Sequence, residues 1–246
     1  MYHKKDQIIY VGLNNGKIYM YKAKSSENKS MFSKGKDPDI TLLESPNAHK
    51  GEIRKMICTP INEEALEVLF TASADRTVKM WDPKNVKGNA CIQTISGHEG
   101  TILDMVYISK APVDQLITTS TDKTMRIWVI DKSRQLMQYP WFVIYQKITD
   151  FTSINQQLDV DVWINCLEVN ETEKLGIYAG DSEGSLLKFK APKDWRHKCE
   201  FEFEYKKRGI HRFGLGQVLH VKKESCTFTI GFDQMIRGYG ASLDQP

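Results

Sequence analysis

Five segments of similar pattern recur along this chain, and this repetition limits the possible folds more than any other feature does. In each segment a β-prone run leads into a tight turn, and a second run ends in an aromatic residue six positions after the turn residue. The turn residues are Asn15, Asp75, Asp122, Glu183 and Asp233. A unit that recurs five times predicts a repeat architecture.

The residues of each segment predict a β-hairpin. In the second segment the run 68–71 is β-prone, and the run after the turn alternates Val78 and Met80 with Lys79 and Trp81, the period of two expected of a strand. An acidic or Asn side chain in the turn can accept backbone N–H groups, and a following glycine permits an unusual backbone conformation. The sequence therefore predicts an all-β chain.

The turn residues are spaced by 60, 47, 61 and 50 residues, which exceeds the ~40–45 typical of a four-stranded propeller repeat. Two segments account for the excess. Residues 22–39 are rich in Lys, Ser and Asn, and we expect a flexible loop there. Residues 129–161 form a second long insertion, in which we expect an outer strand at about 142–148.

The motif spacing resembles that of the WD40-repeat family. The second segment ends in the dipeptide Trp81-Asp82, and Ala48-His49 stands 26 residues before Asp75. In the third segment, Gly97-His98 stands 24 residues before Asp122, like the Gly-His element of that family. The second and third segments match best, the fifth moderately, and the first and fourth in outline. The resemblance spans essentially all of residues 1–246 and implies a WD40-type β-propeller.

About 18 strands, or some five blades, are expected. The first blade is expected to lack its first strand and the last blade its fourth strand. Family propellers commonly close with about seven blades, and an unclosed array leaves strand edges that recruit other chains. We therefore interpret the chain as part of a larger propeller; a closed five-bladed ring is the alternative.

One set of residues imitates the catalytic triad of a hydrolase. Nucleophilic catalysis needs a single activated hydroxyl beside a cleft, whereas this set of His, Thr, Asp and an aromatic residue recurs in several blades. The resemblance implies a buried hydrogen-bond network, a structural tetrad in each blade, and we expect no enzyme activity. The predicted tetrads are His49, Thr71, Asp75 and Trp81; His98, Thr118, Asp122 and Trp128; and His211, Thr229, Asp233 and Tyr239.

Composition and motifs exclude several other function classes. The net charge of +3 is too mild to predict nucleic-acid or membrane binding by itself. Five scattered cysteines without a CxxC pair favour free thiols in a reducing compartment, and no signal peptide or membrane-spanning stretch is visible. Phosphate-loop and paired metal-ligand spacings are missing. We expect a cytoplasmic protein with no cofactor, metal or small-molecule substrate.

The family resemblance places a docking surface at the turns and at the start of each first strand. The matching positions are Glu52, Thr101, Thr121, Trp163, Ser182 and Phe232, with Arg208 and Arg212 as further candidates for partner contact. We expect a non-enzymatic scaffold that binds other proteins within a multi-subunit assembly, for which composition suggests a cytoskeletal or ciliary setting. The alternative is a binder of nucleic acid or another anionic surface through the basic region 190–212.

Overall fold

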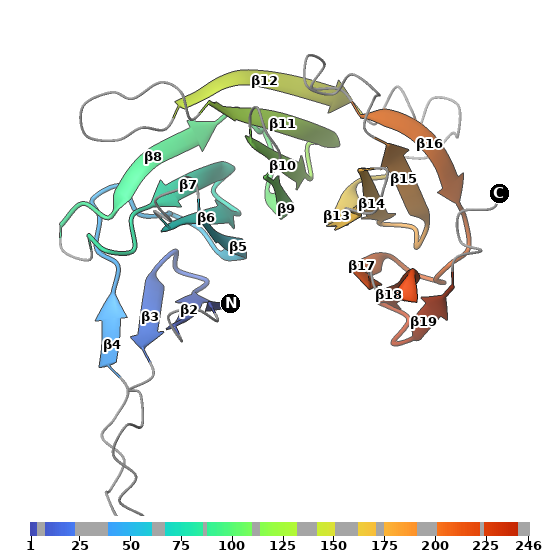
Figure 1. The fold of residues 1–246 in the computed structure, drawn as a ribbon, viewed down its shortest axis with the longest axis horizontal. Coiled ribbons are helices and arrows are strands. Elements are labelled where there is room, and N and C mark those ends of the chain that lie inside the picture. Colours follow the sequence, from blue (N-terminus) through green and yellow to red (C-terminus); the bar gives the residue numbers. More distant parts are fainter. Residues whose placement is uncertain are drawn as a thin grey trace, which may run out of the picture. The chain divides into compact units, whose positions relative to one another are not determined.

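The computed structural model describes residues 1–3, 8–22, 39–60, 67–85, 88–109, 114–131, 142–150, 162–170, 175–190, 201–221 and 224–240. Within these ranges the chain forms nineteen β-strands in five antiparallel sheets, and each sheet is built from strands that are consecutive in the sequence (Figure 1). The strands group into two compact units, residues 1–96 and 97–246.

The first unit holds two four-stranded sheets. The strands of the first sheet are β1 (Tyr2–His3), β2 (Ile8–Gly12), β3 (Ile18–Lys22) and β4 (Asp39–Leu42). The strands of the second sheet are β5 (Ile53–Pro60), β6 (Glu67–Ser73), β7 (Thr77–Trp81) and β8 (Cys91–Ser96). Strand β6 is buried along its whole length, as expected of a strand inside a blade with both faces covered.

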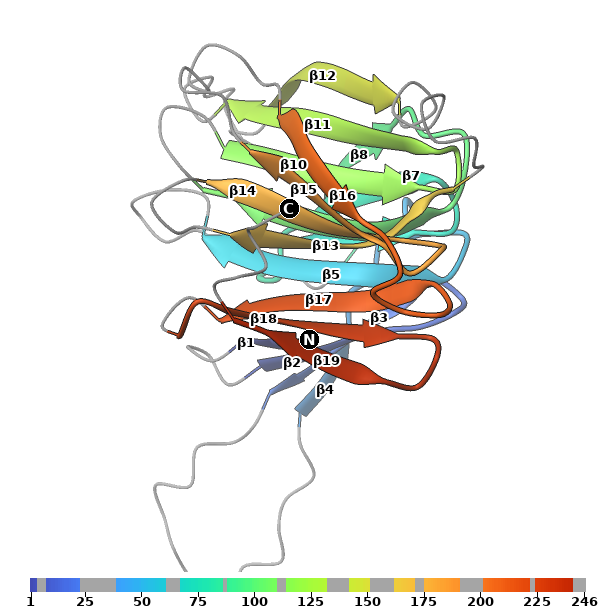
Figure 2. The same ribbon diagram turned by 90° about the vertical axis from the view of Figure 1, so that its right-hand side faces the viewer.

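The second unit holds two four-stranded sheets and one three-stranded sheet. The third sheet comprises β9 (Ile102–Ile108), β10 (Asp114–Ser120), β11 (Thr124–Asp131) and β12 (Phe142–Asp150). The fourth comprises β13 (Ile164–Asn170), β14 (Gly176–Asp181), β15 (Leu186–Lys190) and β16 (Glu202–Lys207). The last comprises β17 (Leu215–Val221), β18 (Cys226–Gly231) and β19 (Ile236–Tyr239), with β19 at its edge (Figure 2).

Within each unit, successive sheets stack in one sense. We call the face of a sheet that carries Thr71, Thr118 or Thr229 its near face, and the opposite side its far face. In the first and fourth sheets, Val11 and Ala179 occupy the matching position and define the near face. The far face of the first sheet packs through Tyr10 and Ile18 against Leu69 and Trp81 on the near face of the second. In the second unit, the far face of the third sheet packs on the fourth, and the far face of the fourth packs on the last. The first strands β9, β13 and β17 lie side by side, so each blade begins beside its neighbour.

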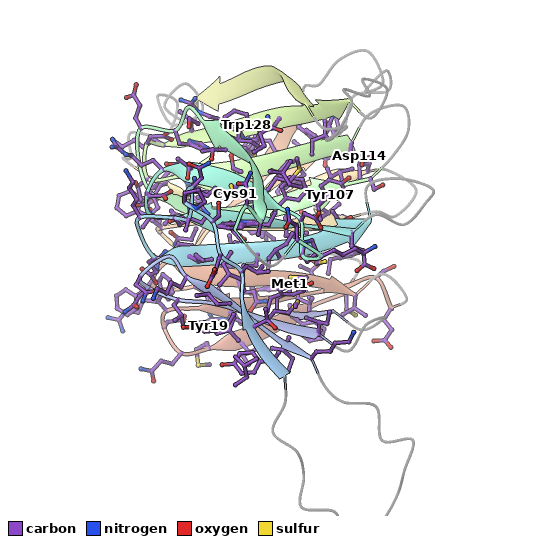
Figure 3. All side chains as sticks on the ribbon, turned by 90° about the vertical axis from the view of Figure 1, so that its left-hand side faces the viewer. Met1, Tyr19, Cys91, Tyr107, Asp114 and Trp128 are labelled. Atoms are coloured by element: carbon purple, nitrogen blue, oxygen red, sulfur yellow. The ribbon has the colours of Figure 1, made fainter. Side chains whose placement is uncertain are left out.

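Most elements predicted from the sequence are confirmed, with two differences. Residues 2–3 form an additional short strand that pairs with β2, so the first sheet has four strands and the total is nineteen rather than about 18. The N-terminal ammonium of Met1 donates to the carbonyl of Tyr10 at 2.8 Å and holds this strand in place (Figure 3). The insertion predicted from residue 129 overlaps β11 by three residues, because 129–131 still belong to that strand. The predicted outer strand is present as β12, and most of the loop predicted at 22–39 lies outside the described residues.

Side-chain contacts also join neighbouring strands within a sheet. In the third sheet, the hydroxyl of Tyr107 on β9 donates to the carboxylate of Asp114 on β10 (Figure 3). Asp114 is buried, so this contact satisfies a charge that would otherwise be costly to remove from water. The strand pairing at this end of the blade is therefore fixed by a polar contact as well as by backbone hydrogen bonds.

Candidate docking face

The predicted tetrad of the second sheet forms a continuous hydrogen-bond chain. The indole Nε1 of Trp81 donates to Thr71 Oγ1 at 2.7 Å, Thr71 Oγ1 lies 2.7 Å from His49 Nε2, and His49 Nδ1 lies 2.8 Å from Asp75 Oδ2. An indole N–H can only donate and a carboxylate can only accept. Because the carboxylate can only accept, His49 Nδ1–H donates to Asp75, and Thr71 Oγ1, which accepts from Trp81, lies within hydrogen-bond distance of Nε2.

The third sheet repeats this geometry. Trp128 donates to Thr118 at 2.9 Å, Thr118 lies 2.7 Å from Nε2 of His98, and His98 Nδ1 lies 2.7 Å from Asp122. The other carboxylate oxygen of Asp122 accepts from the backbone N–H and hydroxyl of Thr124 at 2.9 and 2.7 Å. The histidine and threonine side chains are buried, which leaves the hydroxyl no access to a substrate. The arrangement ties strands to turns and is unsuited to nucleophilic catalysis.

The last sheet keeps three members of the network and replaces the fourth. His211 contacts Thr229 and Asp233, each at 2.8 Å. Tyr239 occupies the predicted aromatic position, but no hydrogen bond joins it to Thr229 in the described part of the chain; it packs against the core, with Lys207 over its ring. Arg237 contacts both His211 and Asp233, the latter at 3.0 Å. The sequence identified the position of Tyr239 and missed the role of Arg237.

The fourth sheet holds its turn in another way. Ala179 and Phe189 stand where the other blades have threonine and tryptophan, and both pack in the apolar core. The acceptor in this turn is Asp181, whose Oδ1 accepts the backbone N–H groups of Glu183 and Ser185 at 3.0 and 2.7 Å, and not Glu183 as the repeat spacing predicted. The buried Oδ2 of Asp181 lies 2.7 Å from Nζ of Lys206 on β16.

Ionisation follows from these contacts. Burial alone would raise the pKa of Asp122, but hydrogen bonds from Thr124, His98 and the N–H of Glu99 outweigh it and lower the pKa to about 2. At Asp75 and Asp233, too, burial would raise the pKa, but hydrogen bonds to the carboxylate outweigh burial and lower the pKa below its usual range. Burial also lowers the pKa of His98, against the opposing effect of Asp122. For His98 and Asp122, the fold therefore favours a neutral imidazole and an ionised carboxylate.

In four of the five blades, a backbone hydrogen bond joins the turn to the segment before the first strand. In the second unit, the backbone N–H of the residue before or at the turn donates to a carbonyl just before the first strand: Thr121 to Thr101 at 2.9 Å, Ser182 to Trp163 at 2.9 Å, and Phe232 to Gly214 at 2.8 Å. In the first unit, the N–H of Ala74 donates to the carbonyl of Glu52 at 2.8 Å. The predicted docking residues therefore occupy equivalent places, with Glu52 in one unit and the others in the second.

Two of these residues gather in one patch of the second unit. The side chain of Phe232 is 65% exposed and Trp163 is 38% exposed, although both sit in hydrogen-bonded backbone. A Cβ built on Gly214 would lie 3.0 Å from the ring of Phe232, from the carbonyl of Ser182 and from the amide of Asn165. The same ring lies 3.0 Å from such a Cβ on Gly216, so the two glycines form a platform beneath it. We name Trp163, Ser182, Phe213 and Phe232 the aromatic patch.

Sequence reasoning missed Phe213 and the purpose of the adjacent glycines. The side chain of Phe213 is exposed, and the guanidinium of the predicted contact residue Arg212 lies 5.7 Å from its ring centroid. Gly214 and Gly216 do not have the spacing of a nucleotide-binding loop, so no function was expected of them from the sequence. In the structure they lie beneath the ring of Phe232. Arg208 is exposed at the end of β16. Among the described residues, no cluster of His, Cys, Asp or Glu could hold a metal ion, and none of the described segments is a helix able to cross a membrane.

Comparison with known proteins agrees with this architecture. Residues 41–82 and 89–129 match the family model described as "WD domain, G-beta repeat". These stretches include the tetrads of the second and third sheets, which share one hydrogen-bond geometry. Residues 41–82 and 89–129 are thus WD40 repeats, and the five antiparallel sheets agree with the blades of a WD40-type β-propeller.

Several fungal proteins are similar to this chain. The chain is 28% identical over 130 residues, 53% of its length, to nuclear distribution protein PAC1 of Candida tropicalis, of which this covers 23%. It is 29% identical over 139 residues to PAC1 of Candida albicans, covering 56% of the chain and 24% of that protein. It is 30% identical over 132 residues to coronin-like protein crn1 of Schizosaccharomyces pombe, covering 50% of the chain and 18% of that protein. The chain spans about a quarter of the length of the first relatives that it matches.

Proposed function

We propose that this chain is a non-enzymatic scaffold that docks a protein segment on the aromatic patch of its second unit. Phe232 is the observation that carries the proposal. A large apolar ring in a hydrogen-bonded turn, supported by two glycines and mostly exposed to water, adds to the exposed apolar surface of Trp163 and Phe213, and such patches mark interaction sites. Aromatic residues presented on rigid backbone dominate the binding energy of protein interfaces.

The chemistry around Phe232 suggests the kind of segment. Ser182 and Asn165 provide polar groups beside the ring, and Arg212 and Arg208 add positive charge at the rim. A segment with an apolar anchor for the ring and acidic flanking residues would match this surface. Such a scaffold would serve a multi-subunit cytoplasmic assembly; the relatives named for nuclear distribution and the coronin-like relative support a cytoskeletal setting, and a ciliary one is a narrower form of this proposal.

The alternative, an anionic surface bound through residues 190–212, has less support from the described residues. Lys206 is buried beside Asp181, Lys188 lies 3.5 Å from Glu204, and Lys207 lies over the ring of Tyr239. Lys188 and Lys206 are engaged within their own blade and Lys207 contacts the next one, so these three lysines of the described residues are already committed to contacts inside the second unit. Residues 191–200 of this basic region lie outside the described residues.

The test is a comparison of bound proteins from cell extract, identified by mass spectrometry. We expect the double variant Trp163→Ala and Phe232→Ala to lose a defined set of partners that the wild type retains. The matched control is Phe203→Ala, which removes an equally exposed aromatic side chain from strand β16. Equal recovery by the wild type and the double variant would refute the docking proposal. Binding that survives the double variant but falls steeply with salt would favour the anionic-surface alternative.

A further inference from the structure

The far face of the last sheet exposes a set of apolar side chains. Alternation along paired strands places Leu219 opposite Phe228, and Ile230 opposite Ile236, all on the far face. These side chains are 49%, 37%, 39% and 69% exposed, respectively. The near face of the same sheet is buried, with Val218 and Thr229 at 2% and 0%. Among the described residues, the near face of this sheet is therefore buried and its far face is exposed.

The same positions are buried in the third sheet. If Thr229 is matched with Thr118, Leu219 corresponds to Val106, Phe228 to Ile117 and Ile236 to Met125. Those three side chains are 8%, 0% and 0% exposed, because the fourth sheet lies on them through Ile164 and Leu167 of β13. The carboxylate of Asp104, on the same face, accepts the backbone N–H of Leu167 at 2.8 Å.

The far face of the fourth sheet is buried in the same way. Its far face carries Cys166, Tyr178 and Leu186, all buried beneath Leu215 and Val218 of β17. Twice in this unit, therefore, the far-face positions serve to receive the near face of a following sheet. The exposed far face of the last sheet has the same composition and the same strand register, so the occupant that fits it is the near face of another blade.

This chain carries such a near face, also exposed, in its first unit. Register places Ile9 opposite Tyr21 and Tyr21 opposite Ile40, on the face opposite the one that packs on the second sheet. Ile9 and Ile40 are 46% and 55% exposed, and Val11 and Tyr19 on this face are partly buried. The face has no tetrad; like the near face of the fourth sheet, with Ala179 and Phe189, it offers apolar and aromatic groups.

We propose that the far face of the last sheet in one copy of the chain binds the near face of the first sheet in a second copy. The residues named on the two faces carry no charge, although charged residues make up 26% of the sequence. Burial of matched apolar surface drives such association, and the contact would continue the blade-on-blade stacking seen inside each unit. The contact joins two different surfaces, so it is a head-to-tail interface. It does not involve Trp163 or Phe232, so it stands apart from the proposed docking function.

Sedimentation velocity over about 1 to about 100 µM, a range matched to moderate affinities, tests the proposal. The wild type is expected to shift reversibly from monomer to larger species. Ile236→Asp blocks the far face and Ile40→Asp blocks the near face; each variant alone is expected to be a monomer. A mixture of the two variants retains one intact interface and is expected to form a 1:1 dimer that grows no further.

Phe203→Asp is the control, because it places the same charge at an exposed aromatic position on β16, outside both faces and outside the aromatic patch. It should assemble like the wild type, and circular dichroism melts should show that all variants fold. A wild type that remains monomeric at the highest concentration would overturn the proposal. So would a mixture of the two blocked variants that remains monomeric, since this result would indicate pairing of like faces.

Discussion

Each tetrad depends on full pairing of its buried polar atoms. In the third blade, Asp122 accepts from His98, Thr124 and the backbone of Glu99, and each of these donors would lose its acceptor if the carboxylate were removed. A buried donor without an acceptor costs more than the hydrogen bond contributes, because it has also lost its water. The network is therefore sensitive to single substitutions although none of its members is large.

We predict that Asp122→Ala lowers the free energy of unfolding by roughly 1–3 kcal/mol, the cost of orphaned buried donors. Urea denaturation followed by tryptophan fluorescence measures the change. Glu183→Ala serves as the control, because the side chain of Glu183 is largely exposed and should change stability by less than about 0.5 kcal/mol. An Asp122→Ala protein as stable as the wild type would show that the network contributes nothing.

At the scale of single elements, the fourth blade exchanges the tetrad for an ion pair between its turn and its outer strand. Lys206 of β16 and Asp181 at the end of β14 are almost fully buried, with side chains 5% and 0% exposed. Removal of one partner from a buried pair leaves an uncompensated charge, which costs more than the loss of a surface salt bridge.

We predict that Lys206→Ala lowers the free energy of unfolding by about 3–5 kcal/mol, the range for breaking a buried pair. The matched control is Lys188→Ala in the same blade, where the partner Glu204 is more exposed; its effect should stay below about 1 kcal/mol. Equal effects of the two substitutions in chemical denaturation would contradict the assigned difference.

The limits of prediction from sequence are clearest at this scale. The hairpins were predictable because alternation and turn residues are local signals, and the tetrads of the second and third blades were implied by the resemblance to the WD40 family. Arg237 could not be found in this way, since its contacts with His211 and Asp233 are visible only in the folded chain. Asp181 was missed because Asp181 and Glu183 both lie in the turn, and only the buried partner Lys206, 25 positions later, distinguishes them.

For the whole molecule, we expect the free energy of unfolding to decrease in acid. The pKa of Asp122 is lowered to about 2 and those of Asp75 and Asp233 are also depressed, so these groups stabilise the fold above the unfolded value of 3.8 and lose that effect as pH falls through the folded values. The pKa of His98 is lowered from 6.5, so the unfolded chain also takes up that proton first as pH falls. Both effects have the same sign.

We therefore predict that the urea midpoint falls continuously from about pH 7 to about pH 2, because the unfolded chain binds more protons throughout this range. Midpoints measured in a series of buffers test this, and Asp122→Asn should flatten the part below about pH 4, since an amide does not titrate. A midpoint that rose on acidification would contradict the assigned protonation states.

The Lys206–Asp181 contact also provides a mechanical link that the second and third blades do not have in this form. In the second and third blades the turn acid is fastened to the loop just ahead of the innermost strand, so turn and loop move as one piece. In the fourth blade the acid is fastened instead to the rim strand β16. A displacement of β16 would therefore be transmitted through the ion pair to the turn that bears Ser182, beside the ring of Phe232, without involving the inner strands. Of the blades whose turn contacts are described here, this one alone links the outer edge directly to the aromatic patch.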